Sequence, residues 1–247
     1  MNTCYLSSVL QCLFHTKSIQ RYLRMSRHTD PVALAFAELY HNKQTKPEKF
    51  YRFVKDAHSD FDNNYHHDAH EALMVILEML SKSFGRISDT MFRSRSRRAL
   101  LVWGKEYNII NEIFRVMYRY VHRCRACGHE LTIYETDYCS YDNVVESEQL
   151  DQYRCDRCKT ENRTTRKQTV VHTPQTLITV HRQHLPEDRF LFGNRTYRTF
   201  AVVSHAKFDD RTGHYHTHIL ENDQWVLKDD LTLDAQFKPV ISFAELL

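Results

Sequence analysis

Residues 2–13 read Asn2-Thr3-Cys4-Tyr5-Leu6-Ser7-Ser8-Val9-Leu10-Gln11-Cys12-Leu13, and the interpretation of the whole chain starts from this stretch. Its apolar residues recur with the spacing of one helix face, at Leu6, Val9, Leu10 and Leu13. Cys4 stands just ahead of that face, where the predicted helix begins. A helix start presents N–H groups without helical partners and a partial positive charge, so it favours the thiolate, the nucleophilic form of cysteine. This position suits a catalytic cysteine, whereas Cys12, inside the helix, is expected to be a small buried apolar residue.

The composition is that of an ordinary globular protein, with 247 residues, 42% hydrophobic and 26% charged. We expect one domain over residues 1–247, with room for a sizeable insertion. The net charge of +3 is too small by itself to indicate binding to nucleic acid or to a membrane. No apolar run approaches the roughly 20 residues of a membrane span, and a signal peptide is not expected. Seven cysteines, four of them in two Cys-x-x-Cys pairs, favour a reducing, intracellular compartment.

The first half of the sequence predicts helices. Beyond the Cys4 helix, helical segments are expected over residues 31–41, where Pro31 is well placed at a helix start, and from Pro47 to about His58. The clearest helix begins at Asp68, which has capping-box spacing to Glu71. Its apolar face comprises Leu73, Ile76, Leu77, Leu80 and Phe84.

The second half predicts strands. An alternating segment runs from Phe114 to Tyr120. Further strands are expected at Thr169–His172, Leu177–Val180, Phe200–Ser204, Tyr215–Leu220 and Trp225–Lys228. Helices first and antiparallel strands later predict an α+β fold. Between the halves, residues 85–105 are rich in arginine and lack periodicity, which favours a solvated loop over a nuclear-localisation or acidic-partner patch.

Two Cys-x-x-Cys pairs, Cys124/Cys127 and Cys155/Cys158, predict a metal site. Each pair can offer two thiolates to one tetrahedral zinc ion, and Gly128 supplies a small residue for the turn after the first pair. A redox motif is a weaker interpretation, because such motifs occur singly near a βαβ unit. A nucleic-acid-binding zinc ribbon is also weaker, because aromatic and basic residues do not gather around the cysteines, so no nucleic-acid partner is expected.

His214 differs from the other histidines of the chain. It follows Gly213, precedes Tyr215 and opens a predicted strand. A β-hairpin from this strand into the next would bring Asp229 or Asp230 back beside His214. A base and its orienting carboxylate are assembled in this way beside an activated nucleophile, so the pattern supports cysteine catalysis.

Together these segments resemble the ubiquitin-specific protease family of deubiquitinases, in the right order and over nearly the whole chain. Residues 2–13 look like the family's cysteine box, and Asp68-Ala69-His70-Glu71-Ala72-Leu73 is similar to its Asp-Ala-His-Glu-Phe-Leu helix. Residues 153–158, with the segment Pro174-Gln175-Thr176-Leu177-Ile178, resemble the second zinc knuckle and the strand after it. The histidine box corresponds to Ala201–His205, Gly213–Tyr215 and Trp225–Asp230.

The resemblance implies a papain-like fold of thumb, palm and zinc-bearing fingers, in a shortened form, with the fingers inserted at about residues 110–172. It implies one structural zinc ion and a catalytic triad of Cys4, His214 and Asp229, with Asp230 as the alternative acid. The implied substrate is the C-terminal glycine of ubiquitin joined to a lysine, so the expected partners are ubiquitin and ubiquitinated proteins.

Ubiquitin's tail, Arg-Leu-Arg-Gly-Gly, calls for acidic residues and a narrow passage in the cleft. Asp68 and Glu71 are the candidates for binding it, as charge-assisted acceptors. The alternative is that the two acids only cap their helix, and both roles are compatible.

The sequence departs from the family pattern at several positions. The family's oxyanion-donating Asn, five residues before the cysteine, would precede Met1, and losing such a donor costs on the order of 10²–10³ in rate. Asn2 or backbone N–H groups near Cys4 would substitute, or the gene product begins upstream. Ser7 and Ala72 replace a family Asn and Phe, and the fingers are short. Three functions therefore stay open: an active deubiquitinase, a catalytically impaired ubiquitin-binding pseudoprotease, and a protease for a related ubiquitin-like modifier.

Overall fold

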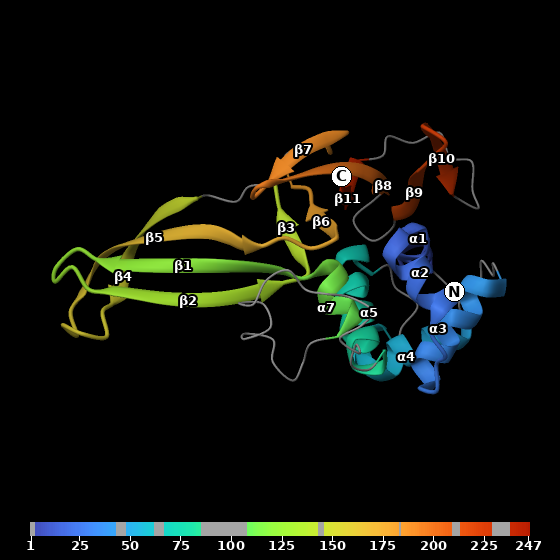
Figure 1. Cartoon of the computed structure of the whole chain (residues 1–247), viewed down its shortest axis with the longest axis horizontal. Coiled ribbons are helices and arrows are strands. Elements are labelled where there is room, and N and C mark those ends of the chain that lie inside the picture. The colour runs from blue at the N-terminus through green and yellow to red at the C-terminus, as the bar shows by residue number, and fades with distance from the viewer. Residues whose placement is uncertain are drawn as a thin grey trace.

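The computed structural model describes residues 3–42, 48–61, 67–84, 108–142, 146–182, 184–208, 213–228 and 238–247. Within them it has a layer of helices, a seven-stranded sheet that covers one side of this layer, and a four-stranded sheet that projects away from both (Figure 1). Helices come first and the strands follow, so the predicted α+β class is confirmed.

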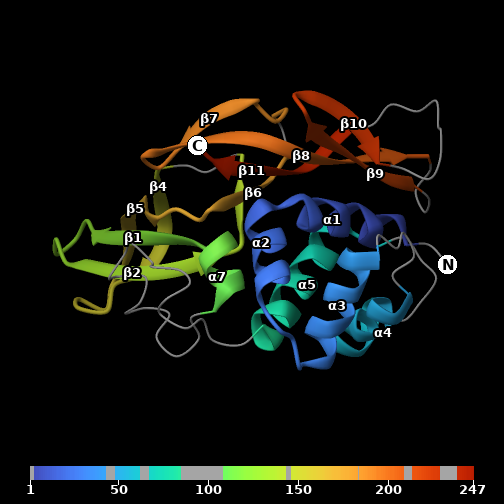
Figure 2. The same ribbon diagram turned by 45° about the vertical axis from the view of Figure 1, so that its right-hand side comes forward.

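The helical layer is centred on the N-terminal helix. Its long helices are α1 (Cys4–His15), α2 (Lys17–Met25), α3 (Pro31–Asn42), α4 (Glu48–Ala57) and α5 (Ala69–Ser83), with the shorter η1 (Ser59–Phe61) and α7 (Ile109–Phe114). Helix α1 lies between α5 and the seven-stranded sheet (Figure 2). Because neighbours lie on both sides, seven of its twelve residues are buried, including the whole predicted apolar face.

Asp68 sets the start of α5. Its carboxylate accepts hydrogen bonds from the N–H groups of His70 (2.6 Å) and Glu71 (3.4 Å), which are otherwise without helical partners. The predicted cap is therefore confirmed. Beyond it the predicted apolar face is buried, at Leu73, Ile76, Leu77, Leu80 and Phe84.

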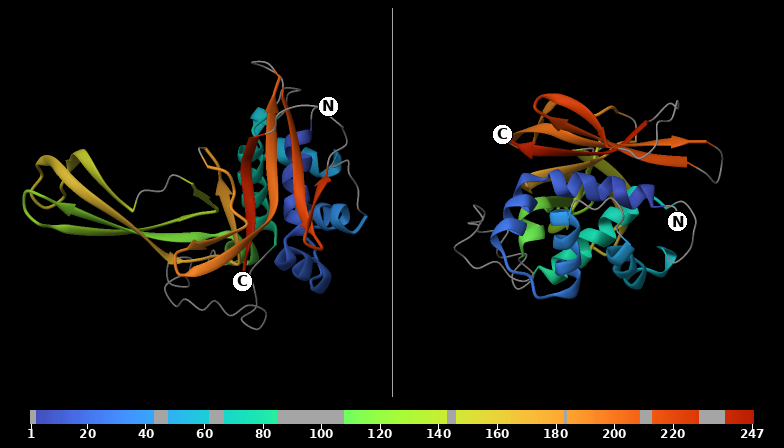
Figure 3. Two further views of the ribbon diagram at one scale, coloured as in Figure 1. Left: turned by 90° about the horizontal axis from the view of Figure 1, so that it is seen from above. Right: turned by 90° about the vertical axis from the view of Figure 1, so that its right-hand side faces the viewer.

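The seven-stranded sheet, which we call the palm sheet, carries the C-terminal half of the chain. Its strands are β3 (Cys139–Tyr141), β6 (Thr176–Val180), β7 (Arg189–Phe192), β8 (Arg195–Lys207), β9 (Gly213–Glu221), β10 (Gln224–Lys228) and β11 (Lys238–Leu246). Six of them run in the order β10-β9-β8-β11-β6-β3, and β7 pairs with β8. Asn222 and Asp223 close the β9–β10 hairpin with φ of 50° and 62°, as a tight primed turn requires. Seen along its edge, the palm sheet covers the helical layer (Figure 3, right).

The four-stranded sheet, which we call the finger sheet, is antiparallel throughout. It comprises β1 (Val116–Cys124), β2 (Glu130–Asp137), β4 (Ser147–Arg154) and β5 (Glu161–His172), in the order β2-β1-β5-β4. It extends well beyond the rest of the molecule (Figure 3, left). At its base a small apolar cluster joins it to the palm sheet, formed by Val116, Tyr118, Leu177, Tyr197 and Ala244.

One strand prediction is wrong at its first residue. Phe114 ends helix α7, and the strand begins only at Val116. The side chain of Asn108 accepts a hydrogen bond from the N–H group of Asn111 (3.0 Å) and so caps a short helix. Since Phe114 and the three isoleucines of this helix are buried, packing and the cap override the alternating pattern.

Some predictions fall outside the described residues: the basic loop at 85–105, and both Asp229 and Asp230. Among the helices that the structure describes, none has the length and apolarity to span a membrane.

Candidate active site

Cys4 lies where the sequence predicted it, as the first residue of α1. The first intrahelical bond runs from the N–H group of Ser7 to the carbonyl of Thr3 (2.8 Å), and Thr3 gives no side-chain cap. The N–H groups of the first turn therefore have no acceptor within the helix, and they point toward the region of the Cys4 side chain. Cys4 is half-buried, whereas Cys12 is fully buried and burial raises the pKa of its thiol. Of the two cysteines on this helix, Cys4 is the accessible one.

Helix α1 and strand β9 run side by side in the same direction. Thr217 on β9 donates a hydrogen bond to the carbonyl of Ser8 (3.0 Å), and further along Glu221 pairs with His15 (3.2 Å). From the Thr217–Ser8 contact, His214 lies three strand residues back, about 10 Å. Cys4 lies four helix residues back, about 6 Å. The two residues are thus brought to the same end of the helix–strand pair, as their proposed roles require.

Tyr215, the residue after His214, is where three elements meet. Burial first, and then the negative charges of Asp68 and Cys4, raise the pKa of its hydroxyl to about 12. The N–H group of Ala69, at the start of α5, acts on the same hydroxyl in the opposite direction and lowers its pKa. The starts of α1, α5 and β9 therefore converge around one side chain. In the sequence, Tyr215 is marked only by its place beside His214, so its contacts with other elements could not be predicted from it.

The hairpin that carries His214 is formed as predicted. Strands β9 and β10 pair antiparallel, with Trp225 opposite Leu220 and Lys228 opposite Thr217. His214 is half-buried near the start of β9. Asp229 follows Lys228 directly in the sequence but lies outside the described residues, so its place beside His214 stays a prediction.

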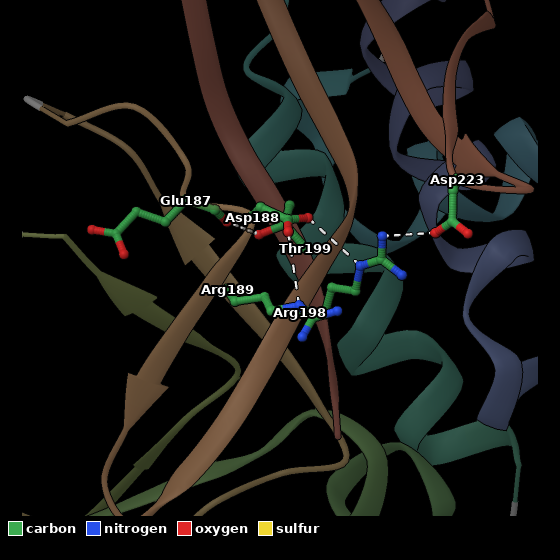
Figure 4. Close-up of polar contacts among 6 residues, drawn as sticks. All are labelled: Glu187, Asp188, Arg189, Arg198, Thr199 and Asp223. Carbon is green, nitrogen blue, oxygen red and sulfur yellow. Dashed lines mark hydrogen bonds and ion pairs between the residues drawn. The ribbon is translucent and has the colours of Figure 1, made fainter.

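The tip of this hairpin is held from strand β8 by an arginine. Arg198 donates to the carboxylate of Asp223 in the turn (2.8 Å) and also pairs with Asp188 (3.6 Å), as Figure 4 shows. The neighbouring residue, Thr199, donates its N–H group to the carbonyl of Asp188 (2.9 Å). Because these charges are solvent-exposed, the pairs add little stability, and their effect is to orient the turn.

The two acids proposed for substrate binding lie at the start of α5. Asp68 is exposed although its carboxylate caps the helix, and Glu71 is exposed one turn further on. Both carboxylates are therefore accessible at the start of α5, and their role in substrate binding stays a prediction. Behind them, His67 contacts the ring of Tyr5 (5.3 Å between ring centres), which links this segment to α1.

The four predicted metal ligands come together at the end of the finger sheet. The sulfur atoms of Cys124, Cys127, Cys155 and Cys158 all lie within 4.8 Å of one another. The Cys124–Cys158 and Cys127–Cys155 sulfur pairs are both 3.8 Å apart. A tetrahedral ion with zinc–sulfur bonds of about 2.3 Å would separate its ligands by about 3.8 Å. The cluster could therefore hold a metal ion.

The two knuckles have matching backbones. A residue with positive φ follows each pair, Gly128 at 69° and Lys159 at 59°, and each donates its N–H group to the carbonyl of the first cysteine of its pair (2.9 Å). The predicted need for a small residue applies at Gly128, and a lysine takes the equivalent position in the second knuckle. A hydrogen bond with the hydroxyl of Thr160 lowers the pKa of the Cys158 thiol to about 6.

The fold matches solved structures of ubiquitin-specific protease catalytic domains. A SAGA DUB module of Ubp8, Sgf11, Sus1 and Sgf73 bound to monoubiquitin has a chain that superposes with a TM-score of 0.74 at 14% identity, covering 100% of this chain and 67% of that one. A second structure of such a module, bound to ubiquitin aldehyde, gives a TM-score of 0.69 at 14% identity, covering 100% of this chain and 68% of that one. The predicted papain-like fold of thumb, palm and fingers is confirmed.

Residues 1–239 match the family model described as ubiquitin carboxyl-terminal hydrolase, and the chain belongs to this family. Among curated relatives, ubiquitin carboxyl-terminal hydrolase 12 of Salmo salar is 24% identical, over 93% of this chain and 78% of that protein. Usp2 of Drosophila melanogaster is 23% identical, over 76% of this chain. The match spans only 24% of the length of Usp2.

Proposed function

We propose that this chain is a cysteine-dependent deubiquitinase, which hydrolyses the bond after the C-terminal glycine of ubiquitin. The observation that carries the proposal is the packing of α1 along β9, with Thr217 hydrogen-bonded to the carbonyl of Ser8, which supports a site that includes Cys4 and His214. Family membership supports the same chemistry. We further propose that residues 1–247 form one catalytic domain, with the fingers at about 110–172.

The proposed reaction follows from the chemistry of these groups. The Cys4 thiolate attacks the glycine carbonyl, and N–H groups of the first turn of α1, with Asn2, would stabilise the oxyanion. His214 protonates the lysine amine, which departs, and the glycine carbonyl then remains bound to Cys4 as a thioester. His214 then takes a proton from water, which attacks the thioester and releases the glycine carboxylate. Asp229, or Asp230 in its place, would fix the orientation of the His214 ring.

The expected partners are ubiquitin and ubiquitinated proteins. Asp68 and Glu71 would receive the arginines of the ubiquitin tail, since an arginine–carboxylate pair is a strong charge-assisted contact. The finger sheet would contact ubiquitin's folded body, and we propose that one structural zinc ion holds its end through Cys124, Cys127, Cys155 and Cys158.

The test is reaction of the purified chain with ubiquitin that carries a C-terminal electrophile, followed by intact mass and peptide mapping. A single adduct is expected on Cys4, lost in Cys4→Ala and in His214→Ala. Cys12→Ala is the matched control on the same helix and should label like wild type, because Cys12 is buried. An adduct that survives Cys4→Ala would refute the proposed nucleophile.

The other two functions predict different outcomes of the same assay. Ubiquitin that binds without forming an adduct would indicate a pseudoprotease. Reaction with a ubiquitin-like modifier of similar Gly-Gly tail, but not with ubiquitin, would indicate a different modifier. Either result would replace the proposed substrate or activity while leaving the fold unchanged.

A further inference from the structure

A second histidine, His205, lies beside the start of β9. In the register of β8 and β9, His205 pairs with Tyr215, and Ala206 pairs with His214. The imidazole of His205 stacks on the ring of Tyr215, with ring centres 4.2 Å apart and an angle of 26° between the planes. This is a close aromatic contact, made with the residue that follows His214.

The same imidazole also covers the residue that precedes His214. A Cβ atom built on Gly213 would lie 2.4 Å from Nε2 and 3.0 Å from Cε1 of His205, and 2.7 Å from the carbonyl oxygen of Ala206. Real Cβ atoms essentially never approach other atoms so closely, so only glycine leaves room for the His205 ring here. His205 therefore contacts both chain neighbours of His214.

Tyr215 in turn is anchored away from β9. The N–H group of Ala69 and the charges of Asp68 and Cys4 all act on the pKa of its hydroxyl, which places the hydroxyl near the starts of α5 and α1. A ring that is stacked on His205 and has its hydroxyl beside α5 has little freedom. The main chain that carries His214 is then fixed relative to the helix starts that carry Cys4 and Asp68.

We propose that His205 is a positioning residue for His214, acting by stacking on Tyr215 and by filling the space above Gly213. This inference rests on the proposed function. Its physical basis is that a displacement of about 1 Å in a catalytic group can cost on the order of 10²-fold in rate. Since the contact with Tyr215 is face to face, a flat aromatic ring at position 205 should retain the stacking.

The experiment compares His205→Ala with His205→Phe, which retains a flat ring. Two rates are measured: alkylation of Cys4 by iodoacetamide, read by peptide mass spectrometry, and kcat and KM for a fluorogenic ubiquitin ester. In His205→Ala both the alkylation rate and kcat should fall about tenfold or more, with KM within about twofold. His205→Phe should recover most of both rates.

The control is His41→Ala, which removes another imidazole–tyrosine contact, made with Tyr40 at 5.1 Å in helix α3. It should leave both rates unchanged. Thermal melting of each variant reports whether it is folded. Should His205→Ala not fold, His205→Leu keeps more of the volume without a flat ring to stack on Tyr215, and it should lower the same two rates.

Two outcomes, seen while wild type is active, would overturn the positioning role. One is a folded His205→Ala variant with unchanged rates. The other is a His205→Phe variant that is as slow as His205→Ala. Failure of the proposed function looks different, because wild type itself would then show no preferential alkylation of Cys4 and His214→Ala would behave like wild type. That second result would overturn this inference as well.

Discussion

At the residue scale, Asp68 has two roles that substitution can separate. Its carboxylate caps α5 through the N–H groups of His70 and Glu71, and its charge is proposed to bind an arginine of the ubiquitin tail. Asp68→Ala removes both and should lower the free energy of unfolding by about 1 kcal/mol. Asp68→Asn keeps the cap, so its free energy of unfolding should stay within about 0.5 kcal/mol of wild type, while KM for the ubiquitin ester rises severalfold. Urea unfolding and steady-state kinetics measure the two effects.

Glu71→Gln is the matched control, because Glu71 is exposed on the same helix turn and its side chain is not needed for the Asp68 cap. It should leave stability unchanged and raise KM. An unchanged KM in both Asp68→Asn and Glu71→Gln would contradict the proposed binding of the tail arginines and leave capping as the role of Asp68.

The residues predicted from sequence are those with local signals. Cys4 was found from the helix that follows it, and Asp68 from its spacing to Glu71. The contact of His205 with Tyr215 and Gly213 carries no local signal, because it depends on how β8 pairs with β9. In the sequence, the contact is reflected only by Gly213. A glycine alone does not indicate which side chain packs against it.

At the element scale, we expect the end of the finger sheet to depend on the proposed metal. The cysteine cluster joins the β1–β2 turn to the β4–β5 turn, where exposed charged residues surround it. Removing the ion with a chelator should therefore disorder this end and raise KM for the ubiquitin ester. Alkylation of Cys4 should stay within about twofold, because the cluster is remote from α1 (Figure 1).

The substitution that corresponds to chelation is Cys155→Ser, with Asp156→Asn as its control inside the same knuckle. Metal analysis should find one zinc per chain in wild type and in Asp156→Asn, and a loss in Cys155→Ser. One zinc per chain in Cys155→Ser would contradict the four-sulfur site.

A buried face helps prediction but does not ensure it: α3, α5, β6 and β9 are predicted, whereas α2 and β11 also bury apolar residues and are not. These four predicted elements pack on the core with one face. Their apolar residues therefore recur with the spacing of a helix or a strand. Strands β2 and β4 have mostly polar side chains on both faces, so alternation is faint and strand propensity is weak. These strands form because β2 pairs with β1 and β4 pairs with β5. Such pairing cannot be predicted from the sequence of one segment alone.

At the scale of the whole molecule, the candidate active site depends on how the helical layer packs against the palm sheet. The sequence predicts α1 and β9 separately and the family resemblance implies their proximity, but neither gives the register of a helix on a sheet. That register is set by contacts between distant segments: Thr217 with Ser8, Glu221 with His15, and Lys17 with Glu245. The last two are partly exposed and contribute little, so we expect the buried Thr217–Ser8 bond to contribute most among these three polar contacts.

Two substitutions of Thr217 test this bond. Both partners are buried, with Thr217 fully enclosed. Thr217→Val keeps the volume and removes the hydroxyl, whereas Thr217→Ser keeps the hydroxyl and removes a methyl group. Each should lower the free energy of unfolding by about 1 kcal/mol, through a lost hydrogen bond in one case and a small cavity in the other. Their effects on stability are therefore similar, and a difference in activity cannot be attributed to stability.

If the bond sets the position of Cys4 relative to His214, Thr217→Val should lower kcat for the ubiquitin ester severalfold, while Thr217→Ser stays near wild type. The measurement is kcat for the two variants at a temperature where urea unfolding shows both fully folded. Equal kcat values would mean that apolar packing alone seats α1 on β9. A greater loss in Thr217→Ser would mean that the filled volume around Thr217, rather than the hydrogen bond, holds the helix start in place.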